Sequence, residues 1–376
     1  MERAYKFRIE PTKAQVTQIE KTFGCTRFVY NYYLAHRKGL FETARETMNY
    51  NACSADLTKL KKELVWLKEA DATALQSALK NLDTAYSNFF AKRTNYPQFH
   101  KKHGKRKAFT SKKVNGNIAV FHSKGVLKLP KLGFVRCRYS RHVEGRIVSA
   151  TVSKNPVGKY FVSLLCTEVE MPQLPKTGFS VGLDLGLKDM FTPSDGDPTP
   201  NCKFARSQQN KMRRLQRSLS RKTRGSHNCH KARSKVAKLH EQIANQRRDF
   251  FHTTSIQLIK KYDLIAIETL KVKNMLKNRK LSRAISDVSW SSFVTMLEYK
   301  AAWYGKTVVK VGLFYASSQL CHVCGYKNPD VKDLKVRSWI CPQCTTEHQR
   351  DQNAAINILK EAQRLLQPHV SEDPKH

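Results

Sequence analysis

Acidic residues are scarce in this chain of 376 residues. Only 30 Asp and Glu stand against 68 Lys and Arg, which leaves a formal net charge of +38. An excess of one sign on this scale repels itself in a compact fold unless a polyanion compensates it. Lysine and arginine release condensed counterions when they meet phosphates, so the balance favours nucleic acid as the partner. A very soluble basic protein, or one lying on an anionic membrane, is the alternative.

Long apolar runs are also missing. No stretch approaches the roughly 18 apolar residues that a membrane-spanning helix needs, so no membrane partner is expected. Residues 1–10 alternate charged and apolar side chains and do not predict a secretory signal, which favours a cytoplasmic location with reduced cysteines. Neither a dinucleotide-binding fingerprint nor a P-loop is present, which argues against an oxidoreductase or a kinase.

Hydrophobic patterns divide the first half into helical and strand-rich blocks. Tyr5, Phe7 and Ile9 alternate with charged residues and predict an opening strand, after which Thr12 can cap a helix. Leucine stripes at helical spacing predict a helix-rich block up to about residue 93. Short β-rich runs with glycines then predict a small barrel, which the opening strand could complete. The helical block would in that case be an insertion into the barrel.

The second half alternates apolar strands with basic helices. The run Phe179–Leu183 predicts an apolar strand, Leu264–Ile267 predicts a buried strand and Val308–Val311 predicts a further strand. Residues 203–250 predict two very basic helices with apolar stripes, joined by a hairpin at Gly225. The near-absence of acids there favours phosphate contact over a merely solvated face. The cations expected to make that contact are Lys211, Arg213, Arg214, Arg217 and Arg221.

Four of the ten cysteines form a metal-binding pattern. Cys321, Cys324, Cys341 and Cys344 follow the spacing C-x2-C-x16-C-x2-C, which is typical of a zinc ribbon. Each close pair can curl around one side of the metal, and four thiolates leave no open position, so the role should be structural. His322, inside the first pair, is not needed as a ligand. Two chance pairs or a redox pair are the alternatives.

Three acids stand where a carboxylate needs a partner. Asp184 and Glu268 lie in apolar strand patterns, and Asp351 begins a helical pattern after the cysteines. Such an acid is costly to bury unless it is paired or binds a cation, and each alone could be a salt-bridged core acid or a helix cap. Together they fit phosphodiester hydrolysis, in which two divalent ions about 3.5–4 Å apart stabilise the attacking and leaving oxygens. Hard carboxylate oxygens suit Mg²⁺.

At these positions the sequence resembles TnpB, the RNA-guided nuclease of insertion sequences, which is related to type V CRISPR effectors. The matching segments are spread over nearly the whole chain. They are Arg27–Asn31, Leu127–Lys131, Gly182–Asp189, Ile267–Glu268, Leu297–Lys300, the paired cysteines and Arg350–Ala355.

The resemblance implies an α+β multidomain fold. Its parts would be an RNase H-like RuvC nuclease domain with a zinc-ribbon insertion, and a small β-barrel wedge domain that carries a helical recognition insertion. The expected boundaries are 1–12 and 95–172 for the wedge domain, 13–94 for the recognition domain, 173–320 and 345–367 for the nuclease domain and 321–344 for the ribbon. The polar residues 368–376 are expected to form a disordered tail.

The resemblance also implies an RNA-guided, metal-dependent DNA endonuclease encoded by a transposable element. It would make double-strand breaks at guide-complementary sites next to a short flanking motif. Asp184, Glu268 and Asp351 match the catalytic acids, which would bind two Mg²⁺ ions beside one structural Zn²⁺. The expected partners are a guide RNA from the element end and double-stranded target DNA, in the prokaryotic cytoplasm near the nucleoid. The residues that match the motif-reading face are Tyr50, Ser54 and Gln76.

Two positions depart from the family pattern. Gln349 stands where an acid commonly precedes the last catalytic Asp, and Thr269 stands where an acid or amide often follows the catalytic Glu. The alternative function is a transposase or a transposition-regulating DNA-binding protein. A transposase would need strand transfer as well as hydrolysis, and no tyrosine or serine is marked as a nucleophile. A binding-only RNA-guided repressor and a structural zinc-ribbon protein are further alternatives.

Overall fold

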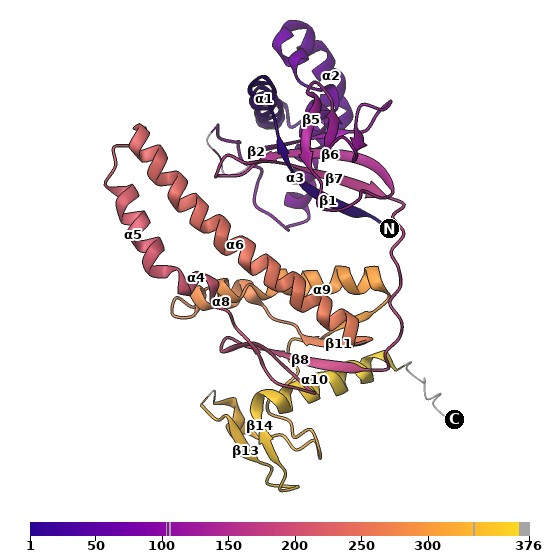
Figure 1. Ribbon diagram of the computed structural model, residues 1–376, viewed down its shortest axis with the longest axis vertical. Helices are drawn as coiled ribbons and strands as arrows, with labels where there is room; N and C mark the ends of the chain where they lie inside the picture. Colours follow the sequence, from indigo (N-terminus) through magenta and orange to yellow (C-terminus); the bar gives the residue numbers. More distant parts are fainter. Residues whose placement is uncertain (103, 105–106, 334, 368–376) are drawn as a thin grey trace. The chain divides into compact units, whose positions relative to one another are not determined.

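The computed structural model describes residues 1–102, 104, 107–333 and 335–367. The chain forms two compact units, Met1–Glu170 and Met171–His376 (Figure 1). Helices and strands occur in both, which confirms the expected α+β multidomain class. No helix in the described part of the chain has the length and apolar character needed to cross a membrane. The predicted disordered tail lies outside the described residues.

The first unit is built on a seven-stranded sheet of order β2-β6-β7-β1-β5-β4-β3. The opening strand β1 is central, because Tyr5 pairs with Leu164 of β7 and Ile9 pairs with Cys137 of β5. Pairing in the described residues runs from β2 to β3, and closure of the sheet into a barrel stays a prediction. The strands are β1 (Arg3–Glu10), β2 (Lys107–Lys112), β3 (Ala119–Phe121), β4 (Val126–Leu129), β5 (Gly133–Arg138), β6 (Arg146–Lys154) and β7 (Tyr160–Thr167).

Helices of the first unit fill the chain between β1 and β2. Thr12 caps the first helix as predicted: its Oγ1 accepts from the backbone N–H of Gln15, and its own backbone N–H donates to Gln15 Oε1. The predicted leucine stripes form a common core that includes Leu57, Leu75 and Leu82. The helical elements are α1 (Lys13–Ala44), α2 (Tyr50–Glu63), the 3-10 helix η1 (Val65–Glu69) and α3 (Ala72–Phe90).

The second unit is built on a five-stranded sheet of order β10-β9-β8-β11-β12. The strands β8, β11 and β12 run parallel, and β9 and β10 continue from β8 as an antiparallel meander. The three predicted apolar strands are confirmed, whereas the sequence patterns did not indicate β9 and β10. The strands are β8 (Ser180–Leu185), β9 (Asp189–Pro193), β10 (Thr199–Pro200), β11 (Leu264–Glu268) and β12 (Thr307–Val311).

Both faces of this sheet are covered. Ile265 and Ile267 pack with α6 and α9 on one face, whereas Ala266 packs with Ile358 of α10 on the other. Figure 1 shows these helices on opposite sides of β8 and β11. Alternate residues of a strand point to opposite faces, so the strand sequence decides which side chains meet α10. The covering helices are α6 (His227–Lys261), α9 (Trp290–Tyr304) and α10 (Arg350–Leu366).

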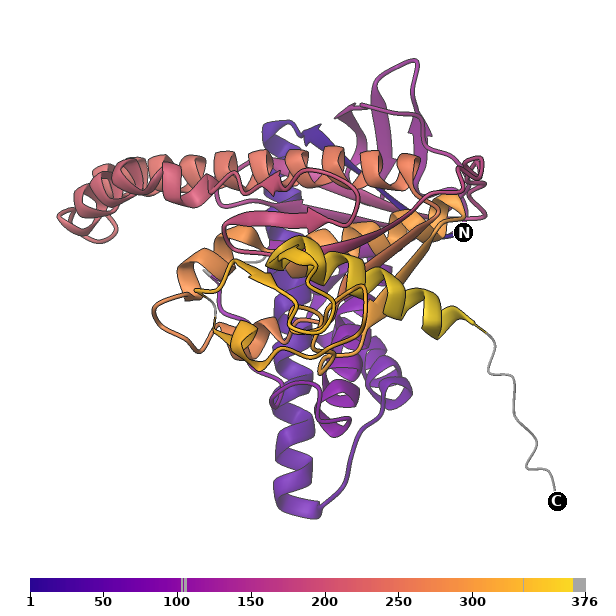
Figure 2. The same ribbon diagram turned by 90° about the horizontal axis from the view of Figure 1, so that it is seen from below.

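The basic segment forms the predicted helical hairpin. Helix α5 (Gln209–Ser220) folds back against α6, and Ser226 caps α6 by accepting a bond from Cys229 N (Figure 2). Helix α6 runs to Lys261, well beyond the predicted end near residue 250. The remaining elements are α4 (Phe204–Ser207), α7 (Val272–Met275), α8 (Ser282–Val288), the 3-10 helix η2 (Pro329–Lys332), β13 (Ser338–Ile340) and β14 (Glu347–Gln349).

Candidate active site

Two of the predicted acids lie side by side at the carboxyl ends of neighbouring strands. Ile267 of β11 is paired with Leu183 of β8, so the next position along brings Glu268 beside Asp184. The backbone N–H of Leu185 donates to Glu268 Oε1 at 3.3 Å. Side chains two residues apart on a strand point to the same face, so Asp184 lies on the same face as Gly182, and Glu268 on the same face as Ala266. Both carboxylates are therefore on the face covered by α10.

The third acid arrives on the helix that covers this face. Asp351 is in the first turn of α10, where a carboxylate also complements the helix dipole. The helix approaches β8 so closely that a Cβ on Gly182 would lie 2.0 Å from the carbonyl oxygen of Ala355. Glycine at 182 is therefore what lets α10 lie on β8 and carry Asp351 towards Asp184.

Crowding and burial raise the pKa values of the two strand acids. Burial raises the pKa of Asp184 well above its usual range, the carboxylates of Glu268 and Asp351 raise it further, and nearby arginines oppose them. Burial also raises the pKa of Glu268 to about 7, although the hydrogen bond from Leu185 N acts to lower it. Like charges in a low-dielectric setting resist ionisation unless a cation compensates them. The arrangement is therefore chemically suited to a divalent cation.

The three carboxylates are near one another without forming a tight cluster. In the described parts of the chain, the four ribbon cysteines are the only His, Cys, Asp and Glu group whose ligand atoms all lie within 4.8 Å of one another. Asp351 Oδ2 instead lies 3.6 Å from a guanidinium nitrogen of Arg337. This ion pair compensates part of the negative charge of Asp351. Ligation of a shared metal by Asp184, Glu268 and Asp351 thus stays a prediction.

The two residues that depart from the family pattern occupy defined places near the acids. Thr269 Oγ1 donates to the carbonyl of Val311 at 2.7 Å and ties the end of β11 to β12. Gln349 ends β14, pairs with Ser338 and precedes the first residue of α10. Thr269 therefore fixes the strand end that carries Glu268, and Gln349 joins the cysteine segment to the helix that carries Asp351.

Sequence reasoning did not identify two side chains near the carboxyl ends of β11 and β12. Phe314 is 92% exposed, and the ammonium group of Lys271 lies 5.6 Å from its ring centroid. Lys271 follows Glu268 closely, and Phe314 follows Val311, which is paired with Glu268. A large aromatic residue just after an apolar strand pattern is the sequence-level signal that could have singled out Phe314.

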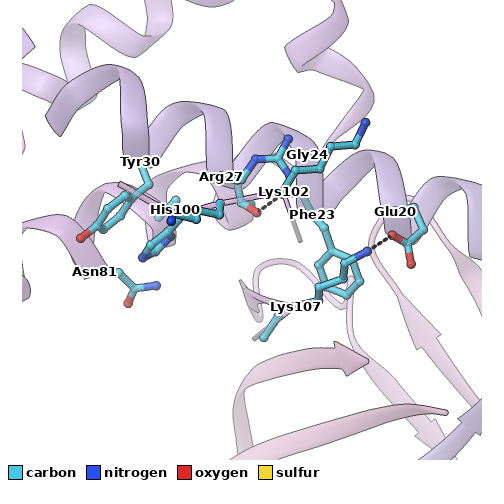
Figure 3. Close-up of a pocket in the computed structure, with 13 residues that line it drawn as sticks. Glu20, Phe23, Gly24, Arg27, Tyr30, Asn81, His100, Lys102 and Lys107 are labelled. Atoms are coloured by element: carbon cyan, nitrogen blue, oxygen red, sulfur yellow. Dashed lines mark hydrogen bonds and ion pairs between the residues drawn. The ribbon is translucent and has the colours of Figure 1, made fainter. Parts of the chain in front are cut away.

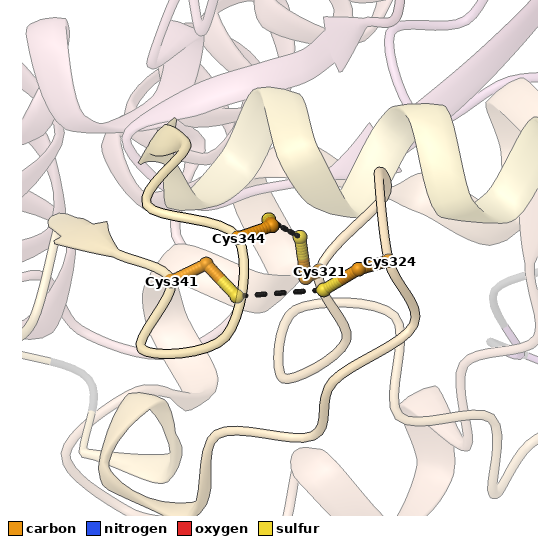
Figure 4. Close-up of side chains that lie close together, drawn as sticks. All are labelled: Cys321, Cys324, Cys341 and Cys344. Carbon is orange, nitrogen blue, oxygen red and sulfur yellow. Dashed lines mark hydrogen bonds between the residues drawn. The ribbon is translucent and has the colours of Figure 1, made fainter.

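The four cysteines meet as predicted (Figure 4). Cys321 Sγ lies 3.5 Å from Cys344 Sγ, and Cys324 Sγ lies 3.6 Å from Cys341 Sγ. A tetrahedron with Zn–S bonds of about 2.3 Å has sulfur–sulfur edges of about 3.8 Å, so the spacing fits zinc. All four are free thiols. The geometry therefore favours a metal site over a redox pair.

Neighbouring groups support the thiolate form of Cys344 and contact the sulfur of Cys321. The hydroxyl and backbone of Thr346 lower the pKa of Cys344 to about 6. Buried His348 places Nε2 3.1 Å from Cys321 Sγ, where an N–H would donate to sulfur. His322, as predicted, stands outside the group, because its Nδ1 lies 3.0 Å from Asn353 Oδ1. Asn353 belongs to α10, so this contact also joins the cysteine segment to the helix.

The cations predicted to contact phosphates project from the hairpin. Half-buried Met212, Leu215 and Leu219 form the stripe by which α5 packs along α6. The exposed residues of the predicted set are Lys211, Arg213, Arg214, Arg217 and Arg221. The hairpin therefore presents a basic surface to solvent.

The residues predicted to read a flanking motif lie on two adjacent helices of the first unit. Tyr50 begins α2, and Lys80 Nζ of α3 lies 5.3 Å from its ring centroid. Gln76 is exposed one turn before Lys80, and Ser54 is half-buried one turn after Tyr50. The structure thus puts Tyr50 near the helix that carries Gln76, while contact with DNA stays a prediction.

Three family models match separate segments of the chain. They are OrfB_IS605, described as "Probable transposase", over residues 164–279, a "Cas12f1-like, TNB domain" over residues 290–358, and a "Helix-turn-helix domain" over residues 1–46. The last description does not fit the structure, because residues 1–46 contain β1 and the single long helix α1.

Relatives match nearly the whole chain. A "Putative RNA-guided DNA endonuclease" of Streptomyces pristinaespiralis is 40% identical over 364 residues, covering 96% of this chain and 89% of the relative. The "Putative RNA-guided DNA endonuclease InsQ" of Escherichia coli K12 is 34% identical, covering 96% and 93%. A solved Cas12f1–sgRNA–target DNA complex shares the fold, with a TM-score of 0.64 at 12% identity over 95% of this chain and 98% of that one. The chain therefore belongs to the TnpB family of RNA-guided DNA endonucleases.

Proposed function

We propose that this chain cuts double-stranded DNA at sites chosen by a guide RNA, using a RuvC-type, Mg²⁺-dependent site formed by Asp184, Glu268 and Asp351. The main support for this proposal is the position of these acids on β8, β11 and α10, at one face of the sheet. Burial and mutual repulsion raise the pKa of Asp184 there. The names of relatives that match 96% of the chain support the class of activity.

The donor set fits Mg²⁺, which prefers carboxylate oxygens and keeps several waters. Bound Mg²⁺ would stabilise charge on the attacking and leaving oxygens and lower the pKa of the attacking water, with two ions serving the two oxygens. Asp184 and Glu268 would hold the metal from the sheet, and Asp351 would hold it from the helix. The N–H of Leu185 fixes one oxygen of Glu268 and leaves the other for the metal. Arg337 would exchange its contact with Asp351 for solvent or substrate phosphate.

We assign one structural zinc ion to Cys321, Cys324, Cys341 and Cys344, on the sulfur spacing given above. The cysteine segment continues through β14 directly into α10. Zinc would therefore stabilise the start of the helix that carries Asp351. This would give the ribbon a positioning role in cleavage without a chemical one.

The partners in this proposal are a guide RNA from the element end and target DNA. The net charge of +38 and the exposed cations of α5 support a long phosphate contact. The sheet of the first unit would act as the wedge domain, its helices as the recognition domain, and Tyr50, Ser54 and Gln76 would read the flanking motif. The second unit would be the nuclease domain, acting in the prokaryotic cytoplasm near the nucleoid.

The deciding experiment compares cleavage with guided binding. Ribonucleoprotein made with the wild-type chain should linearise a matched plasmid in Mg²⁺, and Asp184→Ala should abolish cutting while retaining guided binding. Asp197→Ala, which changes an exposed acid beyond β9, is the control and should cut normally. Retained cutting by Asp184→Ala would contradict the assigned site, and an intact plasmid with the wild-type chain would favour a binding-only repressor.

A second candidate, a transposase or transposition-regulating DNA-binding protein, is favoured by the description of the family model over residues 164–279. Strand transfer joins the cut end to new DNA, whereas hydrolysis leaves free ends. Sequencing the products of the same reaction separates the two. Joined element–target junctions would support a transposase, and free ends alone would support the endonuclease.

A further inference from the structure

The segment Arg27–Asn31 carries part of the family resemblance but lies outside the acid site. It belongs to α1, where it organises the chain around His100. The side chain of Asn31 bonds both backbone groups of His100, accepting from its N–H at 2.8 Å and donating to its carbonyl at 3.0 Å. The rings of Tyr30 and His100 stack with centroids 3.9 Å apart and planes 6° apart. Helix α1 therefore holds His100 in a fixed place.

Beside this stack the first unit has a cavity of about 270 Å³ (Figure 3). Its wall is formed by α1, α3, the segment around His100 and the start of β2. The cationic side chains in the wall are Arg27, Lys101, Lys102 and Lys107. The one acid among the lining residues is Glu20, which accepts bonds from Lys107 at 2.9 Å and from Lys154 at 2.8 Å.

Three of these cations lack a compensating charge. In the described residues no carboxylate lies within ion-pair distance of Arg27, Lys101 or Lys102, while Lys107 is matched by Glu20. Uncompensated cations in the wall of a concave site favour an anionic ligand. Phosphate alone would leave most of a 270 Å³ cavity empty, whereas a nucleotide would occupy it.

The stack supplies a place for a base. Tyr30 is buried and covers one face of the His100 ring, while His100 itself is exposed. Aromatic rings of this kind bind unpaired bases by stacking, and cations alongside bind the adjoining phosphate. Asn81 of α3 lines the same cavity and carries an amide that can bond a base edge. A base inside a duplex is already stacked on its neighbours, whereas an unpaired base is free to stack on a ring, so the arrangement favours single strands.

We propose that this cavity binds one unpaired nucleotide of a nucleic-acid strand, with its phosphate against Arg27, Lys101 and Lys102 and its base on His100. The site is separate from the three acids and from the residues assigned to motif reading. It rests on the proposed function only in that the chain binds nucleic acid.

The test measures binding rather than cutting, with the full-length chain carrying Asp184→Ala. Fluorescein-labelled single-stranded RNA, single-stranded DNA and duplex DNA are titrated by fluorescence anisotropy at several salt concentrations. Arg27→Ala should weaken single-strand binding about tenfold and reduce the slope of log K against log salt by about one, because one phosphate contact is lost. Arg27→Lys should retain the slope, and Arg93→Ala, which changes an exposed arginine outside the cavity, should alter neither value.

The base contact is tested separately at His100. His100→Ala should weaken single-strand binding about tenfold without changing the salt slope, and His100→Phe should restore it, since stacking needs a ring and no charge. Lys102→Glu changes an exposed side chain and provides a variant whose folding is not at risk. It should weaken single-strand binding at least as much as Arg27→Ala.

Three results would overturn the proposal. They are unchanged single-strand affinity in Arg27→Ala and Lys102→Glu, an equal loss for duplex DNA, and displacement of the labelled strand by adenosine monophosphate at equal concentration. The last result would indicate a free-nucleotide site. Because anisotropy reports binding and not cutting, failure of the nuclease assignment in the plasmid assay leaves this result intact. If the wild-type chain cuts the plasmid normally but the cavity variants bind single strands with unchanged affinity, only the cavity proposal is rejected.

Discussion

Lys300 shows how a single buried group can make stability depend on pH. Its side chain lies between α9 and α6, where Nζ donates to the carbonyl of His252 and to Ser255 Oγ, both at 2.7 Å. In the described residues no carboxylate pairs with it, and burial lowers its pKa from the usual 10.5 to about 8. Below pH 8 the folded protein therefore keeps a poorly compensated ammonium group inside.

Stability should consequently rise as pH increases from about 8 to about 10.5. In that window the folded lysine has lost its proton, while the unfolded lysine still binds one, so higher pH favours folding. Lys300→Met should remove this rise and raise the free energy of unfolding at pH 7 by about 1 kcal/mol. Urea unfolding at pH 7, 8 and 9 tests this, with the exposed Lys59→Met as control. If the stability of Lys300→Met still rises with pH in this window, another group causes the rise.

Gly182 decides the packing of one element on another. A Cβ there would lie 2.0 Å from the carbonyl oxygen of Ala355 and 2.9 Å from Leu359 N, both in the backbone of α10. Backbone atoms cannot rotate away as a flexible side chain can, so the helix itself would have to move. That movement would displace Asp351 from the strand acids.

Gly182→Ala should destabilise the protein by about 3 kcal/mol and abolish cleavage. Gly39→Ala is the matched control, because Gly39 lies inside α1 with no atom within 4 Å of an added Cβ. That change should be neutral or stabilise by up to about 1 kcal/mol, since alanine favours helix. Thermal melting and plasmid cleavage of both variants provide the measurement. Equal melting of Gly182→Ala and the wild-type chain would show that α10 does not rest on β8.

The cysteine segment is expected to stabilise α10 through zinc. Cys341→Ser should lower the zinc content from one ion per chain, reduce the melting temperature and weaken cleavage, because β14 leads directly into α10. Cys202→Ser, which changes an exposed cysteine outside the cluster, should alter none of these values. Elemental analysis with thermal melting tests the pair. Full zinc content in Cys341→Ser would remove that cysteine from the ligand set.

At the scale of the whole molecule, the charge excess should appear as salt-dependent binding. Replacing Arg213, Arg214 and Arg217 together by Gln should weaken guide-RNA binding and reduce the slope of log K against log salt by up to about 3. All three are exposed, so the melting temperature should not change. The triple change to Lys keeps the charge and should retain the slope. Filter binding at several salt concentrations tests both, and an unchanged slope in the Gln variant would place the RNA elsewhere.

Much of the fold was predictable because its signals are local. Alternation at Tyr5, Phe7 and Ile9 identified β1, and cap chemistry at Thr12 identified the start of α1. The strands β9 and β10 were missed because they are short, and the larger part of β9 is buried without alternation. Such a run cannot be told from other buried segments by periodicity.

The sequence by itself determined which functional features this protein has. They are a large positive charge, four cysteines at zinc-ribbon spacing, three unusually placed acids and the segments that relate it to TnpB. These follow from residue identity and spacing along the chain. Only the tertiary structure decided which of them meet. The parallel pairing of β8 with β11, and the close approach of α10 at Gly182, put Asp184, Glu268 and Asp351 on one side of the sheet, and α1 assembles the His100 cavity. Contacts between residues far apart in sequence depend on how strands pair and helices pack, which no local pattern specifies.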